Sequence, residues 1–245
     1  MRLGAHAQVL VFSLLAAIGF ATSARAGTTP IVYCGQQLHG RGFLVADLDC
    51  SGYLGHGVII DRGTLDLNGF TIRNAGFYGV HCESWCKIRG PGSVTLNGFD
   101  GVHAENWAMV RDAIISNNGL SGVQARNING GSRVLIKNST ITGNGLNGIE
   151  TDNLAIIRDS IISNNGENGI DVGVQFCDSG GRVMVVSSTV SSNGGSCFGS
   201  PYCADVNSCG RNDPAPRLRN QSMCGTSHVR DSGAPGMNWG VCLLD

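Results

Sequence analysis

The 245-residue sequence contains few charged and few aromatic side chains, and lysine is almost absent. Asp, Glu, Lys and Arg make up 14% of the residues, aromatic residues make up 6%, and Lys87 and Lys137 are the two lysines. The formal net charge is −1. Binding to nucleic acid or to an anionic membrane surface requires an excess of basic residues. We therefore expect neither as a partner of the mature protein.

Long apolar runs are also scarce, and the clearest one lies at the N-terminus. Residues 9–20 are mostly apolar, Arg2 precedes them, and Ala24-Arg25-Ala26 follows. This order is typical of a secretory signal peptide with an A-x-A cleavage site. Cleavage after residue 26 removes two of 17 basic residues and none of 18 acidic ones, which leaves a net charge of −3. We expect an exported protein, extracellular or periplasmic; an uncleaved membrane anchor is the alternative.

Helix-forming stretches are lacking as well, because Gly and Asn interrupt the chain about every ten residues. The leucine lattice of a leucine-rich repeat is missing too. What the sequence has instead is the pattern N-G-x-x-G-[V/I], which occurs at 97–102, 118–123, 144–149 and 165–170, with a looser copy at 74–80. The second glycines lie 22, 21, 26 and 21 residues apart. Such a period indicates stacked units that bury one shared core.

Each repeat predicts three short β-strands joined by three corners. Apolar and polar residues alternate after each second glycine, as in a strand with one buried face. A second strand precedes each turn asparagine, and an apolar third strand lies between them. We expect inward side chains at Val80, Val102, Val123, Ile149 and Ile170, and at Ile115, Ile141, Ile162 and Val190.

The turn asparagines are expected to stack in a column at one corner. If each strand pairs with its copy one turn on, about 4.8 Å away, like residues lie above one another. The amides can then bond backbone groups that the turn leaves free, and the glycine beside each asparagine can adopt a positive φ. The column would contain Asn118, Asn144, Asn165 and Asn193. Basic residues seven positions earlier, Arg111, Lys137 and Arg158, predict a solvated corner, with anion binding as the alternative.

In period, alternation and asparagine column the chain resembles the right-handed parallel β-helix proteins of the pectin lyase-like superfold. The segment 63–72, Gly-Thr-Leu-Asp-Leu-Asn-Gly-Phe-Thr-Ile, is similar to the first coil of many secreted members. The resemblance implies an all-β, right-handed parallel β-helix with disulfide-stapled terminal caps. We expect a signal peptide at 1–26, an N-terminal cap at 27–53, the β-helix at 54–207 and a Cys-rich C-terminal cap at 208–245, because exposed coil ends need cover.

Ten cysteines, an even number, all follow the signal segment. In an exported chain this indicates disulfides. Proximity favours the pairs Cys34–Cys50 and Cys82–Cys86, although the C-x-x-x-C spacing of the second pair also fits metal ligands.

The residue after each inward position must point outward. This predicts one polar column, with a parallel second column two residues further along each strand. We call them together the polar strip. The candidate catalytic residues in or beside it are His81, Asp100, His103, Glu105 and Arg126, and the candidates for substrate binding are Glu83, Gln124, Glu150, Asp152 and Asp171. A solvated polar face without a function is the competing interpretation.

These residue types suit an extended acidic or neutral polysaccharide. Paired carboxylates could hydrolyse a glycosidic bond. A histidine with an arginine could remove the C5 proton of a uronate and neutralise its carboxylate, in elimination or epimerisation. Asp and Glu together could hold Ca²⁺, which we treat as a candidate ligand without assigning a metal site.

Known catalytic motifs match only in part. Residues 98–103 are similar to the Asp-Pro-His signature of mannuronan C5-epimerases, but lack the proline and the acid after the histidine. Gly55-His56-Gly57 matches a short polygalacturonase motif whose other parts are missing, and we interpret it as chance. The Arg-x-x-Arg-x-Pro motif of pectate lyases is absent.

The leading hypothesis is a monomeric, secreted protein that engages polysaccharide along the polar strip, as a lyase, epimerase or hydrolase acting on uronic-acid-containing glycan. The alternative is a non-catalytic extracellular surface, adhesion or carbohydrate-binding module.

Overall fold

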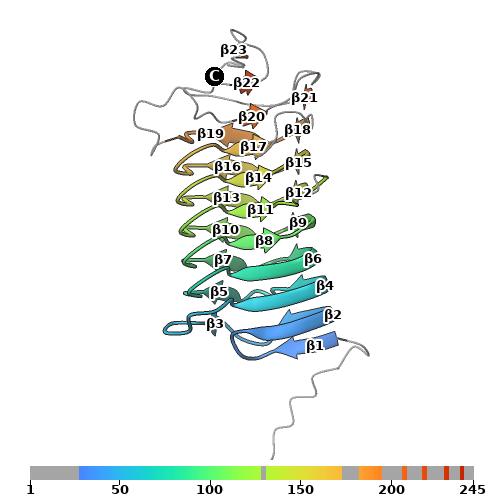
Figure 1. The fold of residues 1–245 in the computed structure, drawn as a ribbon, viewed down its shortest axis with the longest axis vertical. Helices are drawn as coiled ribbons and strands as arrows, with labels where there is room; N and C mark the ends of the chain where they lie inside the picture. The colour runs from blue at the N-terminus through green and yellow to red at the C-terminus, as the bar shows by residue number, and fades with distance from the viewer. Residues whose placement is uncertain are drawn as a thin grey trace, which may run out of the picture.

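The computed structural model describes residues 28–127, 131–172 and 182–194, and the strand segments 206–208, 217–219, 229–231 and 238–239. Over these residues the chain winds into one column of stacked β-strands with no helix (Figure 1). The predicted all-β, right-handed parallel β-helix is confirmed. The described residues form no helix, so this part of the chain has no helix that is long and apolar enough to cross a membrane. The predicted signal peptide lies outside the described residues.

The column has three faces, which we number by the order in which each turn visits them. Face 1 contains β8 (Val102–Ala104), β11 (Val123–Ala125), β14 (Ile149–Thr151), β17 (Ile170–Val172) and β20 (Val206–Ser208). Face 2 contains β9 (Trp107–Arg111), β12 (Arg133–Lys137), β15 (Leu154–Arg158), β18 (Arg182–Val186) and β21 (Arg217–Arg219). Face 3 contains β3 (Leu48–Asp49), β5 (Thr71–Arg73), β7 (Ser93–Thr95), β10 (Ile114–Ser116), β13 (Thr140–Thr142), β16 (Ile161–Ser163) and β19 (Thr189–Ser191).

The first turns are built from longer strands that cover faces 1 and 2 without a break. These are β2 (Gln36–Leu44), β4 (Val58–Asp66) and β6 (Val80–Arg89), and β6 pairs with both β8 and β9. At the start of the column β1 (Thr28–Ile31) pairs with β2. At the other end β22 (Val229–Asp231) pairs with β20, and with β23 (Asn238–Trp239) in an antiparallel pair. The other described strand pairs are parallel.

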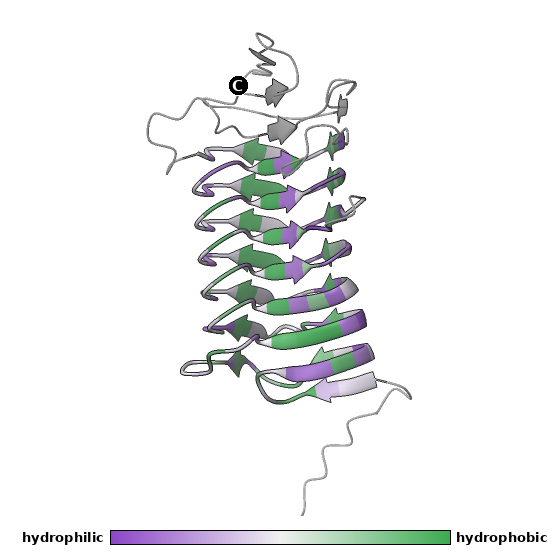
Figure 2. Ribbon diagram, in the orientation of Figure 1, coloured by the Kyte–Doolittle hydropathy of each residue, from purple (hydrophilic) through white to green (hydrophobic). Residues whose placement is uncertain are grey.

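Register aligns each inward residue with its copy one turn on. Val102 pairs with Val80 and with Val123, and Ile149 pairs with Ile170. All nine residues predicted to point inward are fully buried. Figure 2 shows the hydrophobic residues recurring at matching positions of successive strands. The core is therefore a continuous apolar column along the axis, as the sequence predicts.

The predicted asparagine column forms a hydrogen-bonded ladder that also includes Asn97. In each step the side-chain amide donates to Oδ1 of the asparagine one turn on, at 2.9 Å from Asn118 to Asn144 and from Asn144 to Asn165. The same Oδ1 atoms accept the backbone N–H of the preceding asparagine, at 3.1 Å. Because the members from Asn97 to Asn165 are buried, each amide satisfies groups that water does not reach.

The expectation of positive φ at the glycine beside each asparagine is wrong for Gly98, Gly119 and Gly145, although Gly194 has a φ of 89°. Positive φ falls instead on the residue before the asparagine, as at Asn117 (52°). The repeat glycines are needed for close packing. A Cβ at Gly119 would lie 2.1 Å from the carbonyl oxygen of Gly98, and one at Gly145 would lie 2.2 Å from that of Gly119.

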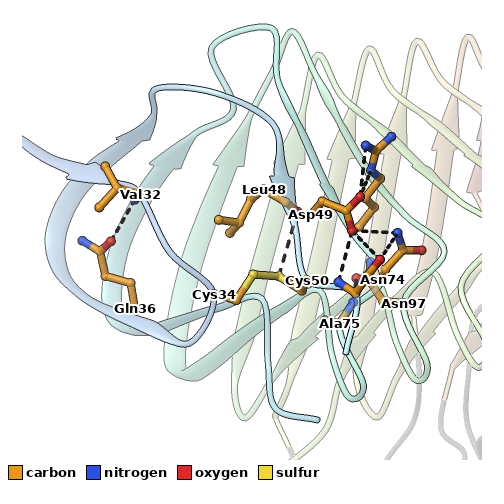
Figure 3. The surroundings of a disulfide bond; sticks show 11 residues. Val32, Cys34, Gln36, Leu48, Asp49, Cys50, Asn74, Ala75 and Asn97 are labelled. Atoms are coloured by element: carbon orange, nitrogen blue, oxygen red, sulfur yellow. Dashed lines mark hydrogen bonds and ion pairs between the residues drawn. A yellow bond between two sulfur atoms is a disulfide. The ribbon is translucent and has the colours of Figure 1, made fainter. Parts of the chain in front are cut away.

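Both disulfides predicted from proximity are present. Cys34–Cys50 joins the turn between β1 and β2 to the residue that follows β3, beside Asp49 and its partner Asn74 (Figure 3). Cys82–Cys86 lies inside the column, where β6 bends from face 1 to face 2. Its sulfurs are joined to each other, so the alternative of a metal site at this pair does not hold. The other six cysteines lie outside the described residues.

Replacing Asn144 by Ala removes the central step of the ladder. The amide N–H groups of Asn118 would lose their acceptor in a buried corner, and one unsatisfied buried group costs about 1 to 3 kcal/mol. We expect the free energy of unfolding, measured by urea titration, to fall by about 2 kcal/mol or more. The matched control is Asn153→Ala, outside the ladder, and an equal loss in both variants would contradict this role.

Candidate functional site

On face 1 two columns of side chains lie opposite each other, the first column of the polar strip, called the strand column, and a facing column. The strand column follows the register of β6, β8, β11, β14 and β17 and contains His81, His103, Gln124, Glu150 and Asp171. The facing column is formed by the residue before each second glycine: His56, Tyr78, Asp100, Ser121, Asn147 and Asn168. Hydrogen bonds cross between the columns, from the Ser121 hydroxyl to Glu150 Oε2 at 2.9 Å and from the Asn147 amide to the same oxygen at 3.3 Å.

Three histidines and a tyrosine gather at the N-terminal end of the strip. The Tyr78 ring is stacked on the His103 ring, with ring centroids 4.2 Å apart and an angle of 5° between the ring planes. Tyr78 is also stacked on His56, with ring centroids 5.1 Å apart. His81 meets this stack edge-on, 4.6 Å from His56, and its Nδ1 lies 3.3 Å from His56 Nε2. The stack thus joins three successive turns of the coil.

Asp100 fixes the orientation of His103. His103 Nδ1 lies 3.0 Å from Asp100 Oδ2, and the other Asp100 oxygen accepts the backbone N–H of Ser121 at 2.9 Å. Asp100 is only 1% exposed, so few other groups compete for it. A carboxylate accepts hydrogen bonds, which assigns the proton to Nδ1 and leaves Nε2 as the basic nitrogen. Nε2 lies 3.9 Å from Glu105 Oε1.

Burial shapes the charge of this cluster. It lowers the pKa of His56 and His81, and the charge of neighbouring imidazoles lowers both further. Burial raises the pKa of Tyr78, with a further contribution from the charge of Asp100. Burial also raises the pKa of Asp100, against the opposing hydrogen bond with His103. Near neutral pH, the lowered pKa values favour the neutral form of both histidines, and the raised pKa of Tyr78 favours its protonated form.

The C-terminal part of the strip is held by carboxylates and one guanidinium group. Arg126 Nε lies 3.1 Å from Glu150 Oε1, and Glu150 is 5% exposed. Burial, followed by the charge of Glu150, raises the pKa of Glu167 in the next turn. Asp171 is buried beside Glu150 in register. Glu150 points away from the core yet is buried, because Ser121 and Asn147 of the facing column cover it.

The structure brings together most of the residues selected from sequence, but not all. His81, Asp100, His103 and Glu105 lie in one cluster, and Gln124 continues its column toward Arg126 and Glu150. Glu83 is exposed where β6 bends. Asp152 turns into the next corner, where its Oδ2 accepts the backbone N–H of Asn127 at 2.8 Å.

Two members of the cluster, His56 and Tyr78, were not selected from sequence. The signal is present, because Gly57 lies 22 residues before Gly79 and extends the repeat one turn toward the N-terminus. On that alignment His56 precedes its glycine as Tyr78 and Asp100 precede theirs. The motif Gly55-His56-Gly57, interpreted as chance, places an imidazole in the cluster.

Among the residues with described placement, no group of three or more His, Cys, Asp or Glu side chains could hold a metal ion.

Residues 50–208 match the family model described as "Right handed beta helix region". The chain belongs to this right-handed β-helix family, and its resemblance to pectin lyase-like proteins is confirmed by the parallel solenoid. One similar solved structure is the periplasmic alginate epimerase AlgG, at 14% identity and a TM-score of 0.56, covering 81% of this chain and 51% of that one. The chain therefore spans about half the length of that enzyme. Pectate lyase Pel9A matches at 16% identity and a TM-score of 0.44, covering 84% and 70%. No curated protein matches.

The lowered pKa of His81 predicts that acid destabilises the fold. The unfolded chain takes up this proton near pH 6.5 and the folded chain only at lower pH. The free energy of unfolding should thus decline as pH falls below 6.5 and should show no contribution from His81 above it. Thermal unfolding between pH 7.5 and pH 5 measures this decline, and His81→Asn should make it shallower. Asp100, whose pKa is raised, has the opposite sign and cannot produce the effect.

The control for this measurement is His39→Asn, since the His39 side chain is 68% exposed. An unchanged pH dependence in His81→Asn, or the same change in both variants, would contradict the assignment.

Proposed function

We propose that the protein acts on a uronic-acid-containing polysaccharide by removing the proton at C5 of a uronate, with His103 as the general base. The observation that carries this is the hydrogen bond between buried Asp100 and His103 Nδ1, with Tyr78 stacked on the imidazole. An imidazole whose tautomer is fixed by a buried carboxylate is a recurring form of general base.

The C5 proton of a uronate is acidic because it lies beside a carboxyl group, and its removal leaves negative charge on that group. A cation near the carboxylate stabilises this charge. Arg126 is the cation of the strip, one turn beyond His103 and two residues after Gln124, the register partner of His103. We assign it to the substrate carboxylate, with Gln124 and Glu150 holding neighbouring hydroxyl groups.

Two outcomes follow from proton removal, and both need a proton donor. In epimerisation, C5 receives a proton on the opposite face of the ring. In β-elimination, the bond between C4 and O4 breaks, O4 takes a proton, and a 4,5-unsaturated end forms. Tyr78 is the donor we assign, because burial raises its pKa and keeps its hydroxyl protonated. The fold that the protein shares with an alginate epimerase is compatible with this chemistry.

Hydrolysis by paired carboxylates has weaker support, because Asp100 is hydrogen-bonded to His103 and Glu150 forms an ion pair with Arg126. A non-catalytic binding module is the other candidate, favoured by the short turns between the strands. Export is part of the proposal, since two disulfides are typical of oxidising compartments.

The test is incubation of the full chain with alginate, polygalacturonate and a neutral glucan. We expect unsaturated ends or inverted C5 centres, detected by ultraviolet absorbance and NMR, with the uronans only. His103→Ala should abolish product, and Asp100→Asn should lower kcat by about 10²-fold or more, since it loses the fixed tautomer.

His39→Ala, exposed and outside the strip, is the matched control and should retain full activity. Binding without product across the panel would replace this proposal by the non-catalytic module. New reducing ends without unsaturation, retained in His103→Ala, would replace it by hydrolysis.

A further inference from the structure

The positive charges of the column are concentrated on the face beside the polar strip. Of the eleven Lys and Arg residues whose side chains are described, nine point outward from face 2 and the strands that extend it. The remaining two are Arg73 on face 3 and Arg126 in the strip. The polar strip instead holds several buried acids, among them Glu150 and Asp171. A chain with a net charge of −1 thus presents one strongly cationic face.

One column of this face places a cation on each of four successive turns. Register aligns Arg89 with Arg111, Arg111 with Lys137, and Lys137 with Arg158. All four side chains are exposed, since the residues before them are buried in the core. Neighbouring members are about 4.8 Å apart along the axis. Asp112, 2.9 Å from Arg111 Nε, is an acid at the margin of this column.

Beside the cation column lies a pair of tryptophans. Trp85 and Trp107 are register partners with ring centroids 6.0 Å apart and planes at 54°, and both rings are half-buried. Lys87 Nζ lies 6.0 Å from one ring centroid and 5.7 Å from the other. Arg133 follows in the same column as the tryptophans. These four residues line an open pocket of about 700 Å³.

A second depression, of about 290 Å³, continues the face toward the N-terminal end. Arg41, Phe43 and Arg89 line it, together with the acid Asp66. It repeats the combination of an aromatic ring with cations. The cationic face is therefore hollowed at two places along the helix axis.

We propose that face 2 is a binding site for a linear anionic polysaccharide with one carboxylate per sugar, lying along the helix axis. Pyranose rings expose an apolar face of C–H groups that packs on aromatic rings, which the tryptophan pocket offers. In an extended chain, each sugar residue is roughly as long as the distance between neighbouring strands along the helix axis. A carboxylate on each sugar can therefore pair with a cation on each turn.

This match of repeat lengths favours a polyuronate over nucleic acid, whose backbone phosphates are further apart. The face would retain the polymer beside the polar strip, which has a single cation of its own. The site is separate from the His103 cluster and requires no reaction there.

The experiment is affinity electrophoresis of the full chain in gels containing polygalacturonate, with alginate as a second probe. We expect Lys87→Gln/Arg133→Gln and Trp85→Ala/Trp107→Ala each to weaken retention about tenfold or more, and added salt to weaken retention of the parent protein. Trp107→Phe, which keeps an aromatic ring, should retain most of the binding, and circular dichroism confirms that each variant is folded.

The matched control is Arg73→Gln, which removes a charge from face 3 and should leave retention unchanged. Repeating the set with His103→Ala separates the two proposals, because that change should abolish product and leave the contribution of face 2 intact. Equal retention of the face 2 variants and the parent would overturn the site. Equal retention in gels containing carboxyl-reduced polysaccharide, or tighter binding of oligodeoxythymidylate than of polygalacturonate, would overturn the assignment to an anionic glycan.

Discussion

The structure depends on the hydrogen-bonded pairing of each strand with its own copy one turn further on. The asparagine ladder keeps this pairing in register, since each amide bonds both the backbone and the amide of the adjacent turn. In a strand with one buried face, a slip of one residue would exchange core and surface side chains. The ladder at one corner therefore helps to determine which side chains meet on faces 1 and 2.

One continuous strand supplies both of those faces. β6 presents His81 on face 1 and Trp85 with Lys87 on face 2, and the buried Cys82–Cys86 disulfide lies where it bends. The disulfide occupies positions that are alanines in the next turn, Ala104 and Ala108. The imidazoles of the cluster are thus separated from the tryptophan pair and Lys87 by one bend of the same strand.

The sequence predicts the repeating part of this architecture because periodic residues report their own environment. Period and alternation identify the inward residues and the asparagine column, and proximity in the sequence identifies both described disulfides. Two properties depend instead on contacts between turns. Glu150 is buried where Ser121 and Asn147 on neighbouring turns face it. His56 joins the cluster through its contacts with Tyr78 and His81 on the next turn. The net charge also does not show that most of the described basic residues share one face, because it is a sum over residues that ignores their positions in the fold.

The histidine cluster lies near the N-terminal end of the described stack of turns, and this position affects its stability against local unfolding. Arrays of stacked repeats open from their ends, where each unit has a neighbour on one side only. The stack of His56, Tyr78 and His103 spans three of these early turns, so fraying of any one of them would dismantle it. Both described disulfides fall within or just before these turns. These disulfides therefore also protect the cluster, and their reduction would free the end of the coil that carries it.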